Sequence, residues 1–331
     1  MTTIARPQVR LAPPRPARLR HWPLLVATLA VAGLVVASLF VGVYDLSQGA
    51  LGQEMFWITR VPRTAALILA GSAMAVSGLL MQMITQNRFA EPTTTGTAEW
   101  AGLGLLVVTI VAPAASLPVK MLVASIAALV GTTVFLLILR RVQLRTSLVV
   151  PLIGIMLGAV VSAFTTYLAV TTNLLQMLGT WFQGSFTGVV RGRYEVLWLV
   201  ALVVVVIYVA ADRFTIAGLG QDLATSVGLN YQRTVFLGAS LVAVATGVTT
   251  VVVGFLPFLG LIVPNVVSLL RGDNLRSNLP WVCLGGVGLV TAADLLGRTV
   301  RMPFEIPVAV ILGIVGSIVF IGLLLRQVPR D

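Results

Sequence analysis

Long apolar stretches separated by short polar gaps fill this chain almost from end to end. A helix needs about 17 to 25 apolar residues to cross a bilayer, and most of these stretches reach that length, although the sixth and eighth are shorter. The pattern predicts an all-α, polytopic membrane protein with ten transmembrane helices. The ten stretches are residues 23–42, 62–83, 94–112, 118–139, 147–170, 196–211, 234–253, 255–270, 279–296 and 305–325.

The composition supports a membrane protein over a soluble one. Hydrophobic residues make up 58% of the chain, and the mean hydropathy is +1.00. Charged residues make up only 10%, compared with about 25% in a typical soluble domain. The single cysteine, Cys283, excludes an internal disulfide and is predicted to be a small buried apolar residue.

The N-terminal residues 1–22 differ from the rest of the chain because they combine arginines with prolines. This composition predicts a basic tail without a packed structure. The apolar run that follows has about 20 residues, whereas the core of a signal peptide has about 7 to 15. We therefore predict a single ten-helix transmembrane domain at 23–326 and a short cytoplasmic end at 327–331.

The basic residues are spread unevenly over the gaps, and this indicates orientation. If the N-terminus is inside, the inside segments carry 15 of the 22 basic residues and the outside segments carry 7. This excess predicts that both termini are cytoplasmic. The net charge of +11 forms no continuous basic face, so nucleic acid is not predicted as a partner. The outside set is Arg60, Arg63, Lys120, Arg191, Arg193, Arg298 and Arg301.

The inventory of reactive residues argues against an enzyme. The only histidine, His21, lies in the basic tail, and no His, Cys and carboxylate cluster has the spacing of a metal site. A P-loop needs Gly-Lys followed by Ser or Thr, but the only lysine, Lys120, follows Val119. No catalytic residue, cofactor or metal is predicted, and ATP hydrolysis by this route would need another subunit.

Two carboxylates fall within the apolar stretches, where a charge is costly. Asp294 lies four residues before Arg298, so one helical face can pair them. Glu99 has no evident partner. It is either a solvated residue at the inner end of the third stretch or a residue that lines a transport pathway. An ion-coupled secondary transporter would be expected to have more charged residues within its helices. It is therefore the weaker alternative to a transporter whose energy comes from ATP hydrolysis by another subunit.

The small residues and prolines predict two further features. Gly154 with Gly158, and Gly313 with Gly316, have the spacing at which helices pack closely. The stretch 254–264, which contains Pro257 and Pro264, predicts a broken helix that must be buried in protein or line a cavity.

Three segments, taken in order, resemble a known family. They are Arg60-Val-Pro-Arg63, the loop 86–96 with its Asn87, and Gly254-Phe-Leu-Pro-Phe-Leu-Gly-Leu-Ile-Val-Pro264. They are similar to motifs of the permease subunits of ATP-binding-cassette importers for iron-siderophore complexes and vitamin B12. The resemblance covers about residues 24–326, and it implies the type II importer permease fold, which has ten helices.

Departures from the motifs indicate the branch. Asn265 follows Pro264 where the family usually has histidine, Arg88 follows Asn87 where proline is usual, and Glu99 with Trp100 replace small residues. Two patterns resemble the ferric-siderophore branch, especially its catecholate-type members: Asn265 with Gly272-Asp-Asn-Leu-Arg276, and Pro92-Thr-Thr with the carboxylate of Glu99. A permease for vitamin B12 or heme of the same family remains the alternative.

The resemblance also implies partners and site residues in a bacterial cytoplasmic membrane. The partners are two ATP-binding cassette ATPases, a second permease subunit, an extracytoplasmic siderophore-binding protein and membrane lipid. The inside loop 212–233 would dock into the ATPase through Gly220, Asp222, Ala224 and Gly228. The outer arginines Arg60, Arg63 and Arg298 would dock the binding protein.

Overall fold

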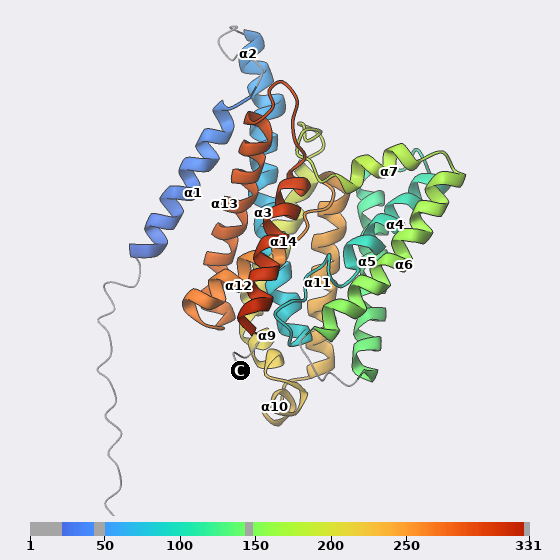
Figure 1. The fold of residues 1–331 in the computed structure, drawn as a ribbon, viewed down its shortest axis with the longest axis vertical. Helices are drawn as coiled ribbons and strands as arrows, with labels where there is room; N and C mark the ends of the chain where they lie inside the picture. Colours follow the sequence, from blue (N-terminus) through green and yellow to red (C-terminus); the bar gives the residue numbers. More distant parts are fainter. Residues whose placement is uncertain (1–21, 43–49, 143–147, 328–331) are drawn as a thin grey trace, which may run out of the picture.

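The computed structural model describes residues 22–42, 50–142 and 148–327, and the described chain is helical with no strand (Figure 1). Most of the predicted basic tail and of the short C-terminal end lies outside these residues. The elements are α1 (Trp22–Phe40), α2 (Ala50–Met55), η2 (Phe56–Arg60), α3 (Val61–Thr85), α4 (Thr97–Val111), α5 (Leu117–Arg141), α6 (Val149–Thr171), α7 (Leu175–Phe182), η3 (Glu195–Leu197), α8 (Trp198–Val209), α9 (Ala211–Gly218), α10 (Gln221–Ser226), α11 (Tyr231–Val252), α12 (Leu259–Arg271), α13 (Leu275–Thr299) and α14 (Val308–Gln327).

Each of the ten predicted stretches contains a helix, but the helices differ in reach. Among the described residues, seven helical segments are long and apolar enough to cross a membrane, or eight if α8 and α9, bent by 64°, form one span. The remaining two, α4 and α12, have only 15 and 13 residues. The described residues confirm an all-α protein with helices long and apolar enough to cross a membrane, whereas the count of ten crossings stays a prediction.

Helix α3 is the central element and α1 is peripheral (Figure 1). In the most apolar stretch of the continuous helix that contains α3, 83% of the residues are buried, compared with 6% in α1. Pro62 lies where η2 passes into α3, and the Ile58 carbonyl, which its missing N–H would otherwise meet, accepts the Arg191 N–H at 3.0 Å. Helix α1 lies at the edge of the bundle and packs mainly against α13.

Glycines let α3 approach its neighbours at backbone distance. A Cβ on Gly71 would lie 3.0 Å from the carbonyl oxygen of Gly286 in α13, and one on Gly78 would lie 2.1 Å from that of Gly260 in α12. Such contacts need residues without side chains.

The two glycine pairs predicted from spacing have different outcomes. Gly154 and Gly158 in α6 do pack closely, against Thr94 and the segment that follows it. Of the other pair, Gly316 meets Phe258, but Gly313 has no atom within 4 Å of its Cβ position. Gly313 therefore makes no close contact within the described chain, and its packing stays a prediction.

Helices α4 and α12 are short because the chain before each returns into the bundle as a loop, at 86–96 and 253–258. The predicted break at 254–264 is confirmed in position but is shorter, since Pro264 lies inside α12. Gly254 has a φ of +93°, and a Cβ there would lie 2.3 Å from the Trp181 carbonyl oxygen. Glycine is required at this turn.

Candidate functional site

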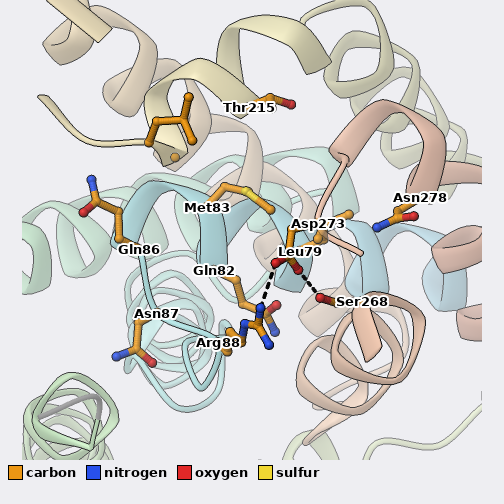
Figure 2. Close-up of a pocket in the computed structure, with 12 residues that line it drawn as sticks. Leu79, Gln82, Met83, Gln86, Asn87, Arg88, Thr215, Ser268, Asp273 and Asn278 are labelled. Carbon is orange, nitrogen blue, oxygen red and sulfur yellow. Dashed lines mark hydrogen bonds and ion pairs between the residues drawn. The ribbon is translucent and has the colours of Figure 1, made fainter. Parts of the chain in front are cut away.

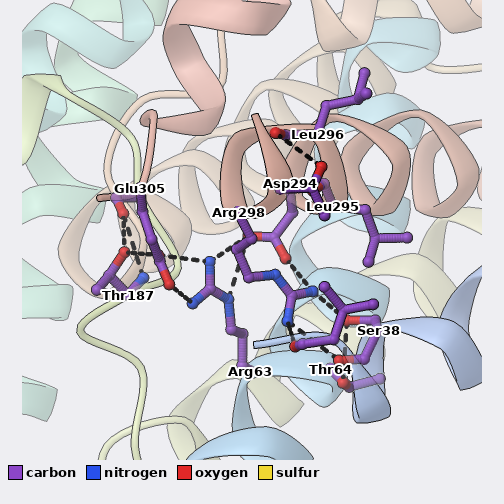
Figure 3. Close-up of polar contacts among 12 residues, drawn as sticks. Ser38, Arg63, Thr64, Thr187, Asp294, Leu295, Leu296, Arg298 and Glu305 are labelled. Carbon is purple, nitrogen blue, oxygen red and sulfur yellow. Dashed lines mark hydrogen bonds and ion pairs between the residues drawn. The ribbon is translucent and has the colours of Figure 1, made fainter. Parts of the chain in front are cut away.

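Three arginines and two carboxylates meet at the end of the bundle that the charge pattern places outside, and Figure 3 shows four of them, Arg63, Arg298, Asp294 and Glu305. Arg63, in the first turn of α3, donates to Asp294 of α13 at 2.6 Å and to Glu305 at 2.9 and 3.0 Å. Arg298 pairs with Asp294 at 2.7 Å, as the four-residue spacing predicted. We call Arg60, Arg63, Arg298, Asp294 and Glu305 the outer arginine cluster.

The cluster is largely buried and joins α1 to the core. Arg298 is 3% exposed and donates to the Val41 carbonyl at 2.8 Å and to the Ser38 hydroxyl at 2.7 Å. Arg60 is 7% exposed and also donates to the Val41 carbonyl. Arg60 and Arg298 were predicted as docking residues, but neither presents an exposed guanidinium. Both guanidinium groups donate hydrogen bonds to carbonyl groups at the C-terminal end of α1, which have no partner within the helix.

The cluster nevertheless borders an open pocket of about 220 Å³. The three predicted arginines all line it, together with Glu305 and Thr187. Three arginines against two carboxylates leave the pocket with a positive charge. Burial alone would raise the pKa of Glu305, but hydrogen bonds from Arg63 and Thr187 hold it below its ordinary value. The pocket can therefore accept an anionic side chain.

The predicted coupling residues lie at the opposite end, in and around α9 and α10. Asp222 and Gly228 are exposed, and Gly228 has a φ of +81° with open space around it. Gly220 has a φ of +108° and lies against Gln86. Ala224 differs from the prediction, because it is fully buried within its own chain and offers no surface to a partner.

The exposed apolar surface of this end is formed by other residues. Leu219, Leu223 and Val227 are 63%, 58% and 66% exposed. Leu223 and Val227 are four residues apart along α10 and its C-cap, so they lie on one side of this helix, and Leu219 lies just before the helix, ahead of Gly220. We call them the α10 apolar face. These apolar residues are visible in the sequence, but the predicted contact was based on the small residues of the loop.

A pocket of about 280 Å³ is lined by residues of α9 and of the inner end of α3 (Figure 2). Met83 and Gln86, at the end of α3, approach Gly218 and Gly220. On the other side of the pocket, Arg88 forms an ion pair with Asp273 at 2.7 Å. The inner end of α3 is thus in direct contact with the loop that carries α10.

Glu99 lies in the first turn of α4 and faces α6. Its Oε2 is buried without a hydrogen-bond partner among the described residues, and a Cβ on Gly158 would lie 3.3 Å from its carboxyl carbon. The residue as a whole is half-buried, so the buried Oε2 argues against a fully solvated helix end. A role in the pathway stays a prediction.

Sequence reasoning missed Glu91, which is 1% exposed and accepts a hydrogen bond from the Phe258 N–H at 2.9 Å. A detectable signal was present, because this carboxylate stands between Ala90 and Pro92 in a loop that also contains Phe89. An isolated charge in such surroundings favours a buried, partnered residue over a solvated one.

Comparison with known proteins gives the family. The model of the FecCD transport family matches residues 24–326. The chain is 55% identical over 305 residues to the petrobactin import system permease protein FatD of Bacillus anthracis, covering 92% of this chain and 91% of the relative. It is 38% identical to the ferric-anguibactin transport system permease protein FatD of Vibrio anguillarum, over 90% and 97% of the two chains.

The chain is 34% identical to a vitamin B12 import system permease protein, BtuC of Serratia proteamaculans, and the match covers 93% of each of the two chains. Among solved structures, an inward-facing conformation of a metal-chelate type ABC transporter superposes with a TM-score of 0.79. That match has 22% identity and covers 92% of this chain and 99% of the other, so it shows a shared fold. The family match and the identities together establish that the chain belongs to the FecCD transport family.

Proposed function

We propose that this chain is the permease subunit of an ATP-driven importer that carries iron(III)-siderophore complexes into the cytoplasm. The observation that carries this proposal is the 55% identity to a petrobactin permease along nearly the whole of both chains. Identity to the vitamin B12 permease is 34%, which makes vitamin B12 the less favoured cargo. The permease itself performs no chemistry.

The proposed assembly contains a second permease, two ATPase subunits and an extracytoplasmic binding protein in a bacterial cytoplasmic membrane. The names of the relatives, which describe permeases of import systems, support this composition. ATP binding and hydrolysis by the partner subunits would switch the pathway between outward and inward access. We propose that Glu99 lies along this pathway, because one of its carboxylate oxygens, Oε2, is buried without a hydrogen-bond partner among the described residues and its carboxyl group is held at the α4–α6 contact.

The outer arginine cluster is the proposed docking site for the binding protein. Its pocket carries a net positive charge and is open at the surface, so an acidic side chain of the binding protein can enter between Arg60, Arg63 and Arg298. Charges at the rim of an interface act mainly on the rate of association. The buried ion pairs below hold the arginines in place.

The α10 apolar face is the proposed contact with the ATPase, and Gly220, Asp222 and Gly228 shape the loop that presents it. Exposed apolar residues on a small solvated helix are typical of an interface. Ala224 supports this face from within, since its side chain packs inside the chain. The contact of Gly218 and Gly220 with the end of α3 connects the ATPase to the membrane core.

The proposed topology has ten crossings and cytoplasmic termini. In this arrangement, α4 and α12 cross the membrane together with the buried loops that precede them. Such loops are tolerated at membrane depth where protein surrounds them. Loop 86–96 satisfies this condition, since Phe89, Ala90 and Thr95 are at most 1% exposed.

Uptake of radioactive iron tests the function. Cells that lack their own petrobactin permease would receive this chain with its partner subunits. We expect uptake of ferric petrobactin that vanadate inhibits and that an uncoupler leaves intact. Uptake of cobalamin alone would favour the vitamin B12 alternative, and uptake abolished by the uncoupler but not by vanadate would favour an ion-coupled transporter.

A further inference from the structure

Glu91 is a buried carboxylate that neither the docking site nor the coupling contact uses. Its Oε1 accepts hydrogen bonds from the Phe258 N–H at 2.9 Å and from the Thr93 hydroxyl. The other oxygen of this carboxylate faces the next turn of the same segment, because a Cβ on Gly260 would lie 3.2 Å from Oε2. Both hydrogen-bonding partners are donors, which a carboxylate requires when it is removed from water.

The backbone N–H of Phe258 belongs to the start of α12, where Phe258 is the N-cap residue. The first N–H groups of a helix have no partner within the helix, and the helix dipole favours a negative charge at that end. Helix α12 begins in the interior, where Leu259 and Leu261 are fully buried, so water does not supply the acceptor. Glu91 supplies it from a loop that is 167 residues away in the sequence.

The same loop also holds the later part of α12. The Arg88 carbonyl accepts a hydrogen bond from the Asn265 side chain at 2.7 Å, and the Arg88 guanidinium pairs with Asp273, just beyond the helix, at 2.7 Å. Loop 86–96 thus places an anion at the positive end of α12 and a cation near its negative end. This polarity matches the helix dipole.

Phe258 extends this connection to α14. Its φ is +59°, an uncommon conformation for a bulky residue that persists only where the surroundings enforce it. The Glu91 hydrogen bond fixes its N–H, and its side chain fills the space left by Gly316 and lies 6.4 Å from the Phe320 ring. A shift of Glu91 would therefore displace a contact on α14.

From this geometry we propose that Glu91 is a positioning residue for transport, which holds the start of α12 and the Phe258 side chain against α14 while the pathway changes access. The inference rests on the proposed function, because transport is the activity it modulates. Glu91 touches no cargo and acts through Phe258 and α12. No docking residue depends on it, so binding-protein recognition should be independent of Glu91.

Two measurements on the complete transporter in nanodiscs or vesicles test the proposal. In Glu91→Gln, we expect the maximal rate of ferric petrobactin uptake per inserted molecule to fall at least tenfold, with the apparent KM for the loaded binding protein unchanged. Hydrogen exchange at residues 258–262 should accelerate at least tenfold, while exchange in α5 stays the same. Glu91→Asp, which keeps the charge, should lie between Glu91→Gln and wild type in both measurements.

Glu195→Gln is the matched control, because this exposed carboxylate also accepts a backbone N–H, that of Gly192 at 2.9 Å. We expect wild-type behaviour from it. Uptake by Glu91→Gln within twofold of wild type would overturn the proposal, and so would exchange that rises throughout the chain. If Glu91→Gln does not insert, unchanged exchange at 258–262 in Glu91→Asp overturns it. Absence of uptake by the wild-type protein would refute the proposed function, and the exchange measurement would still test Glu91.

Discussion

At the scale of single residues, sequence distance decides what can be predicted. Asp294 and Arg298 are one helical turn apart, so their ion pair follows from spacing alone. The pairs of Arg63 with Asp294 and Glu305 join residues 231 and 242 positions apart, and no local pattern encodes them. The same limit applies to Glu91 and Phe258, whose contact is visible only when the two loops are packed together.

Replacing Asp294 should strongly destabilise the protein. Its side chain has no exposed surface and lies between two arginines, so Asp294→Asn would leave buried Arg298 without a counter-charge and Arg63 with Glu305 alone. Breaking a buried pair costs about 3 to 5 kcal/mol. Asp212→Asn is the control, because the exposed Asp212–Arg276 pair should contribute less than about 1 kcal/mol. Unfolding by titration with a denaturing detergent measures both, and equal small losses would contradict this account.

Glu99 tests whether the α4–α6 contact belongs to the pathway. We expect Glu99→Gln to change the rate of ferric petrobactin uptake at least threefold, with assembly and basal ATPase activity retained, because only the charge at an unpaired buried oxygen is removed. The exposed Glu54 in α2 provides the control Glu54→Gln. Unchanged uptake by Glu99→Gln would rule out a lining role.

At the scale of elements, apolar patterning located the helices but not the extent of each one. The predicted stretches included residues 94–96, which read Thr-Thr-Gly, and the apolar residues 255–258, yet both segments form loops. Hydropathy reports removal from water and does not distinguish burial against lipid from burial against protein. The predicted stretches were therefore longer than α4 and α12.

The α10 apolar face should be the element that binds the ATPase. We expect Leu223→Asp to weaken ATPase association at least tenfold and to abolish ATP-driven uptake, with membrane insertion unchanged, because a charge would be buried in the contact. Thr225→Asp adds the same charge to an exposed position of the same helix, away from the side that carries Leu223 and Val227, and should be tolerated. Co-purification of the ATPase measures the association. Equal binding by both variants would place the contact elsewhere.

At the scale of the whole molecule, the arginine distribution predicts which end faces the cytoplasm. Single cysteines at Arg141, Thr225 and Gly188, all exposed positions, would be introduced in a Cys283→Ala background. In intact cells an impermeant thiol reagent should label only the cysteine at Gly188, and the other two should react after the membrane is opened. Labelling of the Thr225 position from outside would overturn the proposed topology.

The glycine crossings of α3 restrict how the transporter can move. A 25-residue helix is about 37 Å long, and α3 touches α13 and α12 through backbone atoms at Gly71 and Gly78. Backbone contacts contain no rotatable side chain that could absorb sliding or twisting. These three helices are therefore expected to move as one rigid body. The freedom to rearrange then belongs to α1 and α6, which are at most one-third buried. We expect distances measured between spin labels within the α3–α12–α13 unit to stay constant through the ATP cycle, while distances from this unit to α6 change.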